Sequence, residues 1–177
     1  MRYAGIIYDD TTAGPGLCLS FYTQGCPIHC EGCHNPQTWD FEGGYEFTPK
    51  TMDNIIKGLC AQGVQRDLCI LGGEPLATQN LFLTTLVIST VREKYPDIKI
   101  WIWTGYEMEQ LLKSNNPHMH TLLTSITGLV TGPFILTQRD ITLPMRGSRN
   151  QKIFIFDKKN NLWYNKENGL EEYKLNG

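Results

Sequence analysis

Short apolar runs alternate with helical patterns along this chain, and no other feature constrains its fold as strongly. The runs 17–23, 67–71, 98–103 and 128–131 have the length of single strands, and a glycine closely follows each of them. Helical patterns fill the segments between the runs. Strand and helix in alternation predict βα units, an α/β fold class and a mainly parallel sheet.

The helix between the first two expected strands is the best marked. Thr48 is a favourable N-cap, and Pro49 suits the first helical position. The pattern then stops near Gly63. The apolar residues at helical spacing are Met52, Ile55, Ile56, Leu59 and Cys60. Two further helices are expected, over 81–91 and over 107–113.

The last part of the chain predicts a hairpin. A fifth strand is expected at 153–156, and 162–164 can pair with it across a turn at Asn160 and Asn161. The chain shows no repeat, and its 177 residues suit a single domain, 1–177, with a sizeable core.

Four unusual loops follow the first four expected strands. They contain, in order, the cysteine cluster, Gly-Gly-Glu-Pro, Thr-Gly-Tyr and Gly-Pro-Phe. Right-handed crossovers place the carboxyl ends of parallel strands at one edge of a sheet, where α/β proteins bind their ligands. We therefore expect these four loops to meet in one functional site.

Three cysteines, Cys26, Cys30 and Cys33, form a C-x3-C-x2-C pattern directly after the first expected strand. Three thiolates in one short loop can hold three irons of a cubane cluster, which leaves the fourth iron without a protein ligand. An open coordination position is typical of catalytic metal sites, whereas structural sites fill their shell. The spacing therefore predicts a reactive iron–sulfur cluster.

Other roles remain open for these cysteines at this point. A zinc site could recruit His29 or His34, and the chain would then be a zinc-stabilised interaction module without catalysis. Zinc-binding chains usually carry a second cysteine pair, however, and this sequence has none. Disulfides are disfavoured by the odd number and by the lack of a secretory context. Cysteines in apolar runs are interpreted as core residues: Cys18, Cys60 and Cys69.

The Gly-Gly-Glu-Pro run follows the second expected strand. Gly72 and Gly73 would let the backbone approach a ligand closely, and Glu74 offers a carboxylate that can accept from an ammonium group. Alone, such a run is also an ordinary turn. Beside the cysteine loop, a ligand-binding role is favoured.

The cysteine pattern and the later Gly-Gly-Glu-Pro together resemble the radical S-adenosylmethionine enzymes. Gly14-Pro15-Gly16, Gln24-Gly25-Cys26 and the run 33–39 are similar to the group that activates glycyl-radical enzymes. One branch of that group, the activators of anaerobic ribonucleoside-triphosphate reductases, resembles this chain further at 103–106, 132–134 and 146–151. The resemblance extends from about Gly14 to Gln151.

The resemblance implies a partial, open TIM-like barrel of the radical S-adenosylmethionine type. It implies that the three cysteines are the catalytic cluster ligands, holding a 4Fe–4S cluster whose open iron takes the amino and carboxylate groups of S-adenosylmethionine. The amino group would be held by Gly72, Gly73 and Glu74. The remaining cofactor-binding candidates are Gly32, Cys33, His34 and Thr104.

The implied reaction is reductive cleavage of S-adenosylmethionine to a 5′-deoxyadenosyl radical. That radical would abstract hydrogen from a glycine of the large subunit of the anaerobic ribonucleoside-triphosphate reductase. A flavodoxin- or ferredoxin-type protein would supply the electron. An activator of another glycyl-radical enzyme, such as pyruvate formate-lyase, is the alternative within the same group, and the Gly-Ser-x-Asn-Gln segment at 147–151 favours the reductase branch.

Two positions depart from the pattern of related enzymes. Gly32 stands where many relatives carry an aromatic residue, and Thr131 stands where the branch usually has aspartate before Gly-Pro-Phe. A ribose- or loop-placing role of that aspartate would pass to the Thr131 hydroxyl. Trp39 and Phe41 are expected to cover the cluster and keep it dry.

Charge and hydropathy exclude several classes of partner. The formal net charge of −2 and the isoelectric point near 6.1 give no electrostatic basis for binding nucleic acid or an anionic membrane. No stretch approaches 18 apolar residues, and the first residues lack the apolar segment of a signal peptide. We therefore expect a cytoplasmic protein whose thiols stay reduced.

Overall fold

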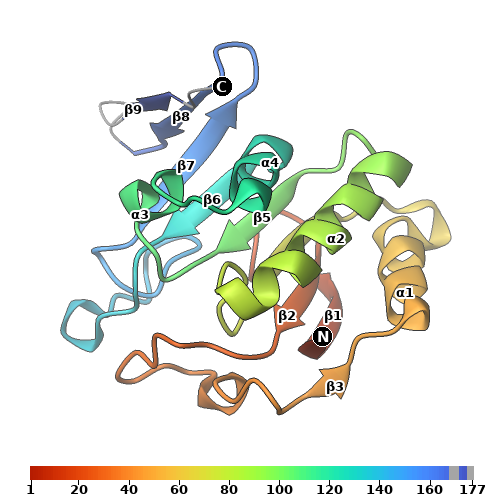
Figure 1. Ribbon diagram of the computed structural model, residues 1–177, viewed down its shortest axis with the longest axis horizontal. Coiled ribbons are helices and arrows are strands. Elements are labelled where there is room, and N and C mark those ends of the chain that lie inside the picture. The colour runs from red at the N-terminus through yellow and green to blue at the C-terminus, as the bar shows by residue number, and fades with distance from the viewer. Residues whose placement is uncertain (168–171, 175–177) are drawn as a thin grey trace.

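The computed structural model describes residues 1–167 and 172–174. Within them, nine strands form one sheet in the order β3-β1-β2-β4-β5-β6-β7-β8-β9 (Figure 1). The strands are β1 (Arg2–Asp10), β2 (Cys18–Thr23), β3 (Tyr45–Glu46), β4 (Asp67–Gly72), β5 (Ile100–Trp103), β6 (Gly128–Thr131), β7 (Lys152–Asp157), β8 (Leu162–Asn165) and β9 (Glu172–Lys174). The helices are α1 (Pro49–Leu59), α2 (Thr78–Lys94), α3 (Met108–Leu112) and α4 (Pro117–Ser125).

Parallel pairing is limited to the centre of the sheet. Strands β2, β4, β5 and β6 pair in parallel, while β1 and β3 on one side and β7, β8 and β9 on the other pair antiparallel. The expected mainly parallel sheet therefore describes only these four strands. The segment 132–151 crosses without an α-helix before β7, and a short turn joins β7 to β8, so neither link makes a parallel crossover. The sheet is open from β3 to β9, and a barrel of the radical S-adenosylmethionine type stays a prediction.

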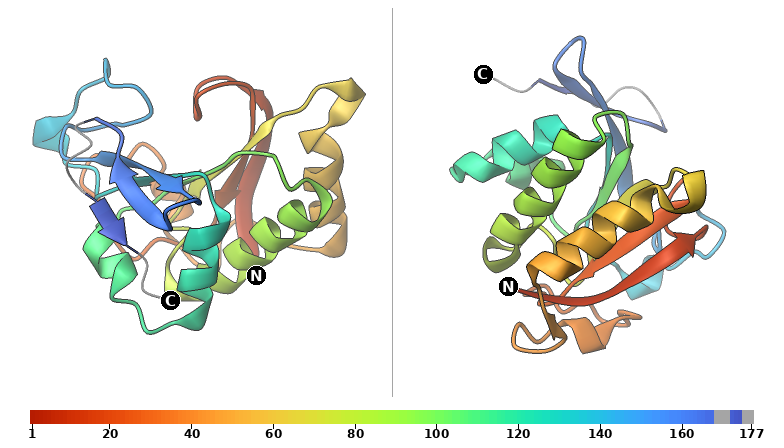
Figure 2. Two further views of the ribbon diagram at one scale, coloured as in Figure 1. Left: turned by 90° about the horizontal axis from the view of Figure 1, so that it is seen from above. Right: turned by 90° about the vertical axis from the view of Figure 1, so that its right-hand side faces the viewer.

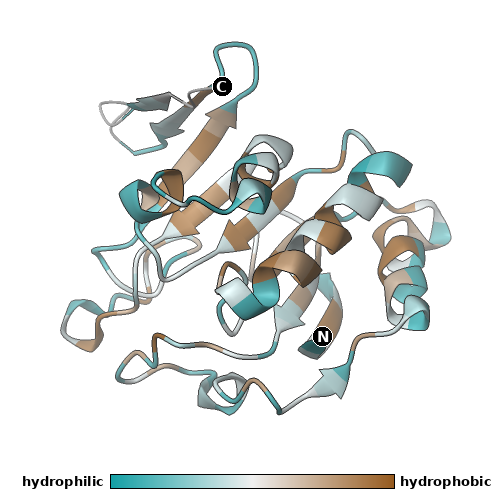
Figure 3. Cartoon of the chain, viewed as in Figure 1, coloured by the Kyte–Doolittle hydropathy of each residue, from teal (hydrophilic) through white to brown (hydrophobic). Residues whose placement is uncertain are grey.

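The two faces of the central strands have different neighbours. Figures 1 and 2 show the helices gathered on one side of the sheet. Alternate strand residues point to these helices and form the main core: Leu19, Phe21, Leu68, Ile70, Ile100, Ile102 and Leu129. The opposite face carries a smaller apolar cluster: Cys18, Cys69, Trp101, Val130 and Ile153. Because both faces are apolar, much of β5, β6 and β7 is brown in Figure 3.

Most of the expected elements are confirmed. The side chain of Thr48 accepts from the backbone N–H of Thr51 and forms a capping box at the start of α1. Strand β6 has the expected bounds, and β8 pairs with β7 as expected. The sequence did not predict β1, β3, α4 or β9. No helix among the described residues is long and apolar enough to cross a membrane.

Candidate functional site

A cavity of about 420 Å³ opens at the carboxyl edge of the parallel strands. The segments 24–44 and 132–151, which form two of its walls, lie along the lower edge in Figure 1. Every predicted site residue except Gly32 lines this cavity: Cys26, Cys30, Cys33, His34, Gly72, Gly73, Glu74 and Thr104. The expected convergence of four loops is confirmed, because Gly132 and Phe134 line it as well. Another cavity, of about 540 Å³, lies at the opposite edge and contains none of these residues.

The cysteine loop is closed at its neck by backbone hydrogen bonds. Gly25 N–H donates to Thr38 O over 2.7 Å, and Cys26 N–H donates to Trp39 O over 3.0 Å. Gly25 has a φ of +96°, and a Cβ at this position would lie 2.0 Å from the Phe41 ring. Glycine is therefore required there, both for the turn and for the close packing of Phe41.

The three cysteines are free and half-buried. Burial raises the pKa of Cys26, although hydrogen bonds from the backbone of Ile28 and His29 oppose the rise. Burial also raises the pKa of Cys30, against a hydrogen bond from the Phe134 backbone. Both side chains are therefore neutral thiols at pH 7, and iron must displace their protons on binding.

The donor set fits a cubane better than a single ion. Among the described residues, no three His, Cys, Asp or Glu side chains converge as ligands of one metal ion. A cubane has a different requirement, because each cysteine binds its own iron. Three thiols distributed around one cavity meet that requirement.

Glu74 is buried, with an exposed fraction of 1%, and both of its carboxylate oxygens accept hydrogen bonds. Its Oε1 accepts from Leu76 N–H (2.9 Å) and from Thr104 Oγ1 (2.7 Å), and its Oε2 accepts from Gly105 N–H (2.7 Å). Burial raises the pKa of Glu74 to about 7, although these three hydrogen bonds favour the charged form. Thr104 therefore holds the Glu74 carboxylate in the cavity wall.

The two glycines before Glu74 bring two loops together. Gly72 has a φ of +104°, and Gly73 N–H donates to Thr23 O over 2.9 Å. A Cβ on Gly73 would lie 2.4 Å from Gly25 O, which itself accepts from Glu74 N–H over 2.8 Å. The backbone of the Gly-Gly-Glu-Pro loop thus packs directly against the residue before Cys26.

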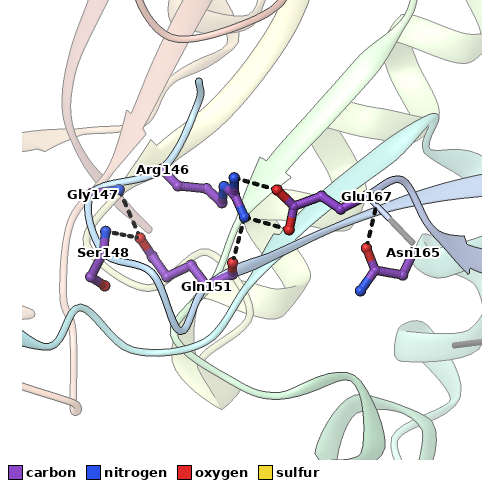
Figure 4. A network of polar contacts seen from close by, with 6 residues as sticks. All are labelled: Arg146, Gly147, Ser148, Gln151, Asn165 and Glu167. Carbon is purple, nitrogen blue, oxygen red and sulfur yellow. Dashed lines mark hydrogen bonds and ion pairs between the residues drawn. The ribbon is translucent and has the colours of Figure 1, made fainter. Parts of the chain in front are cut away.

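The far wall of the cavity comes from the segment before β7, and Figure 4 shows its polar contacts. The Arg146 side chain is 4% exposed and makes a two-pronged ion pair with Glu167, with N–O distances of 2.7 and 2.5 Å. Gln151 Oε1 accepts from Gly147 N–H (2.9 Å) and Ser148 N–H (3.2 Å). The Gly-Ser-x-Asn-Gln segment is therefore an internally bonded wall.

Comparison with known proteins agrees with this arrangement. The family model described as a 4Fe-4S single cluster domain matches residues 12–154. An anaerobic ribonucleoside-triphosphate reductase-activating protein of Vibrio cholerae is 36% identical over 157 residues, covering 88% of this chain and 99% of the relative. Its namesake in Escherichia coli K12 is 33% identical over 154 residues, covering 86% and 97%. The one in Enterobacteria phage T4 is 30% identical over 158 residues, covering 87% and 94%.

This chain belongs to the anaerobic ribonucleoside-triphosphate reductase-activating proteins. The resemblance inferred from its motifs is confirmed, and so is the prediction of a 4Fe–4S activating enzyme of the reductase branch. The relatives are covered almost from end to end.

Some residues next to the cysteines in this activating protein line the cavity, and others lie outside it. His34 is exposed and lines the cavity, whereas Gly32 lies outside it with a φ of +73°. A Cβ on Gly32 would lie 2.9 Å from Leu136 Cδ1, so the far wall packs over the cysteine loop there. Trp39 lines the cavity and stacks on His29, with ring centroids 4.6 Å apart.

Thr131 lies away from the cavity. It is fully buried at the end of β6 and does not line the cavity. Among the described residues, its hydroxyl has no hydrogen-bond partner and makes no hydrogen bond to the cysteine loop.

Sequence reasoning missed several cavity residues: Thr12, Ala13, Tyr22, Leu143 and Met145. Thr12 and Ala13 follow β1, which the sequence did not predict. Tyr22, Leu143 and Met145 belong to no sequence motif, and they line the cavity because the packing of the folded chain places them there. Arg146 lies in a segment that the resemblance included, but its role as a wall residue depends on Glu167, which is far away in sequence.

Proposed function

We propose that Cys26, Cys30 and Cys33 hold the 4Fe–4S cluster and that S-adenosylmethionine binds beside it, so that this protein generates a glycyl radical on an anaerobic ribonucleoside-triphosphate reductase. One observation carries the proposal: a single cavity is lined by all three cysteines and by Glu74. Three cysteines would leave one iron open, and Glu74 would offer its carboxylate from the wall of the same cavity.

Bound together, the cluster and S-adenosylmethionine would supply a reductive cleavage of the sulfonium bond, in which one electron from an external donor yields methionine and a carbon radical able to take hydrogen from a glycine Cα. The protein supplies binding, orientation and the exclusion of water. Cys26 and Cys30 give up their protons when iron binds, since burial keeps both as thiols beforehand.

Glu74 receives the amino group of S-adenosylmethionine. A carboxylate offers about four acceptor positions, and three N–H or O–H donors of the protein occupy three of them. The remaining position, on Oε2, is available to an ammonium group in the cavity. An ammonium also stabilises the charged form of Glu74, which burial disfavours in the empty cavity.

Apolar side chains keep the reaction space dry. Trp39, Trp103, Phe134, Leu143 and Met145 all line the cavity. A primary alkyl radical reacts with most neighbouring groups, so a water-poor and fixed environment is part of the function. Trp103 donates its indole N–H to Met145 O over 2.8 Å, which fixes this apolar wall.

The partner is the large subunit of the reductase, whose glycine must reach the mouth of the cavity. A flavodoxin- or ferredoxin-type protein delivers the electron, and the cytoplasm keeps the thiols available for iron. Neither nucleic acid nor a membrane has a role, in keeping with the net charge of −2.

The decisive experiment is anaerobic reconstitution with iron and sulfide, followed by reduction in the presence of S-adenosylmethionine and the reductase. We expect a brown protein that releases 5′-deoxyadenosine, and an electron paramagnetic resonance doublet of a glycyl radical on the reductase. Alanine at any one of the three cysteines should abolish both. A colourless protein that binds one zinc ion and leaves S-adenosylmethionine intact would refute the proposal.

A further inference from the structure

The side chain of Asn80 joins the two loops that carry the predicted site. Asn80 lies in the first turn of α2 and is 5% exposed. Its Nδ2 donates to Gly25 O over 3.0 Å and to Glu74 O over 2.9 Å. One acceptor precedes the cluster ligand Cys26, and the other belongs to the Gly-Gly-Glu-Pro loop.

These bonds are not a helix cap. The N-cap of α2 is Ala77, which has no side-chain capping bond, and Asn80 N–H already donates to Ala77 O over 2.9 Å. A capping asparagine accepts through its side-chain oxygen, whereas Asn80 donates through its nitrogen. The amide is therefore directed at the loops rather than at its own helix.

The bridge closes a short cycle of hydrogen bonds. Gly25 O accepts from Glu74 N–H (2.8 Å) as well as from Asn80, and Asn80 in turn holds Glu74 O. The absence of a side chain on Gly73 allows the two backbones to touch. An amide nitrogen has two hydrogens, so asparagine satisfies two carbonyls with one group. Such a cycle fixes the separation of Cys26 and Glu74.

We propose that Asn80 is a positioning residue that sets the distance between the cluster and the amino group of S-adenosylmethionine. The inference rests on the proposed function, in which Cys26 binds iron and Glu74 receives the ammonium. Neither acceptor of Asn80 is a reacting group, so it acts only through the two loops. A change of about 1 Å in the distance between the two loops would strongly affect the reaction, because the bound groups must be held in the geometry in which they react.

The test compares Asn80→Ala with Thr84→Val in the reconstituted holoprotein. Thr84 lies one turn further along α2, is equally buried, and donates from Oγ1 to Pro75 O over 2.7 Å. It thus contacts the same Gly-Gly-Glu-Pro loop but makes no hydrogen bond to the cysteine loop. Iron content, the affinity for S-adenosylmethionine, and the change that S-adenosylmethionine causes in the resonance spectrum of the reduced cluster are measured for each.

We expect Asn80→Ala to retain iron, to bind S-adenosylmethionine about tenfold more weakly, and to lose most of the spectral change. Thr84→Val should stay within about twofold of the wild-type affinity and keep the full spectral change. If the alanine variant fails to take up iron, Asn80→Asp replaces it, since aspartate fills the same volume but cannot donate when ionised.

Three results would overturn the inference: wild-type affinity and spectrum in the Asn80 variants, an equal loss in Thr84→Val, or loss of iron from both Asn80 variants. The last would mean that Asn80 builds the cysteine loop rather than setting its distance from Glu74. A wild-type protein that binds neither cluster nor S-adenosylmethionine would refute the proposed function instead.

Discussion

Two walls of the same cavity differ in how many buried hydrogen bonds hold them. One is the Gly-Gly-Glu-Pro wall, formed by the loop 72–75 with Asn80 and Thr104, and the other is the cysteine wall, formed by the loop that carries Cys26, Cys30 and Cys33. On the Gly-Gly-Glu-Pro wall, Glu74, Asn80 and Thr104 are all buried, and their side chains make hydrogen bonds of 2.7 to 3.0 Å. On the cysteine wall, the three thiols are half-buried. One backbone–backbone hydrogen bond, from Cys33 N–H to Cys30 O, lies inside the described segment 27–34.

This difference indicates which part of the site has a fixed geometry before any metal or ligand binds. Buried, bonded polar groups hold one geometry, because each lost hydrogen bond would leave an unsatisfied donor or acceptor. The cysteine loop is held by fewer buried polar contacts, mainly backbone N–H groups directed at the half-buried thiols of Cys26 and Cys30, so it is less restrained. If the proposed function holds, we therefore expect the binding position of S-adenosylmethionine to be formed in the metal-free protein, and the cysteine loop to become fully ordered only when the cluster binds.

The largest expected effect is on hydrogen exchange of the cysteine loop. Loading the cluster should slow amide exchange over 27–34 by more than about tenfold, while exchange over 72–80 changes little. Mass spectrometry of anaerobically prepared samples with and without the cluster measures both segments together. Cys30→Ser, which cannot complete the ligand set, serves as the control and should leave the loop unprotected. Equal protection of 27–34 and 72–80 from exchange in the metal-free protein would refute the claim that the cysteine loop is the less ordered of the two.

A second expectation concerns the free energy of unfolding. Glu74→Ala leaves three buried donors without an acceptor, so we expect a loss of about 3 kcal/mol or more. Glu31→Ala changes an exposed glutamate in the cysteine loop and should stay within about 0.5 kcal/mol. Urea denaturation of the metal-free protein compares the two. Similar losses in the free energy of unfolding would show that the hydrogen bonds of the Gly-Gly-Glu-Pro wall contribute no more to stability than contacts in the cysteine loop.

The raised pKa of Glu74 predicts a dependence of stability on pH. Burial raises this pKa to about 7 from its usual 4.5, so the folded protein holds the proton more tightly than the unfolded chain. The free energy of unfolding should therefore fall as pH rises from about 4.5 to about 7 and then level off. Glu74→Gln removes the titrating group and should remove that part of the slope. A slope that persists in Glu74→Gln would assign it to another group.

The sequence predicted the central strands because their signals are local. The run at 128–131 is bounded by Gly128 and Gly132, and the structure places β6 at those residues. Strand β1 was missed because its residues are mostly half-buried or exposed, without a clear alternation. Helix α4 does have readable signals, Asn116 as N-cap and Pro117 in the first turn, which sequence analysis did not use.

The members of the site were more predictable than their contacts. Motif residues gather in one cavity because parallel strands end at the same edge, and this rule needs no side-chain geometry. The hydrogen bonds of Asn80 depend on the helical rotation of α2 and on how closely the Gly25 and Gly73 backbones approach. Such details follow from packing between segments far apart in sequence, and no local pattern encodes them.

The smallest expected effect comes from Thr131, a buried polar residue that, unlike Glu74, Asn80 and Thr104, makes no side-chain hydrogen bond among the described residues. The Thr131 hydroxyl, at the end of β6, is buried and has no partner among residues 1–167 and 172–174, whereas the Thr84 hydroxyl donates to Pro75 O. Thr131→Val should therefore raise the free energy of unfolding by about 1 kcal/mol, and Thr84→Val should lower it by about 1 kcal/mol. Urea midpoints at an unchanged denaturant slope measure both. If Thr131→Val is destabilising, this hydroxyl has a partner in solution, and the replacement of aspartate by threonine has preserved a polar contact.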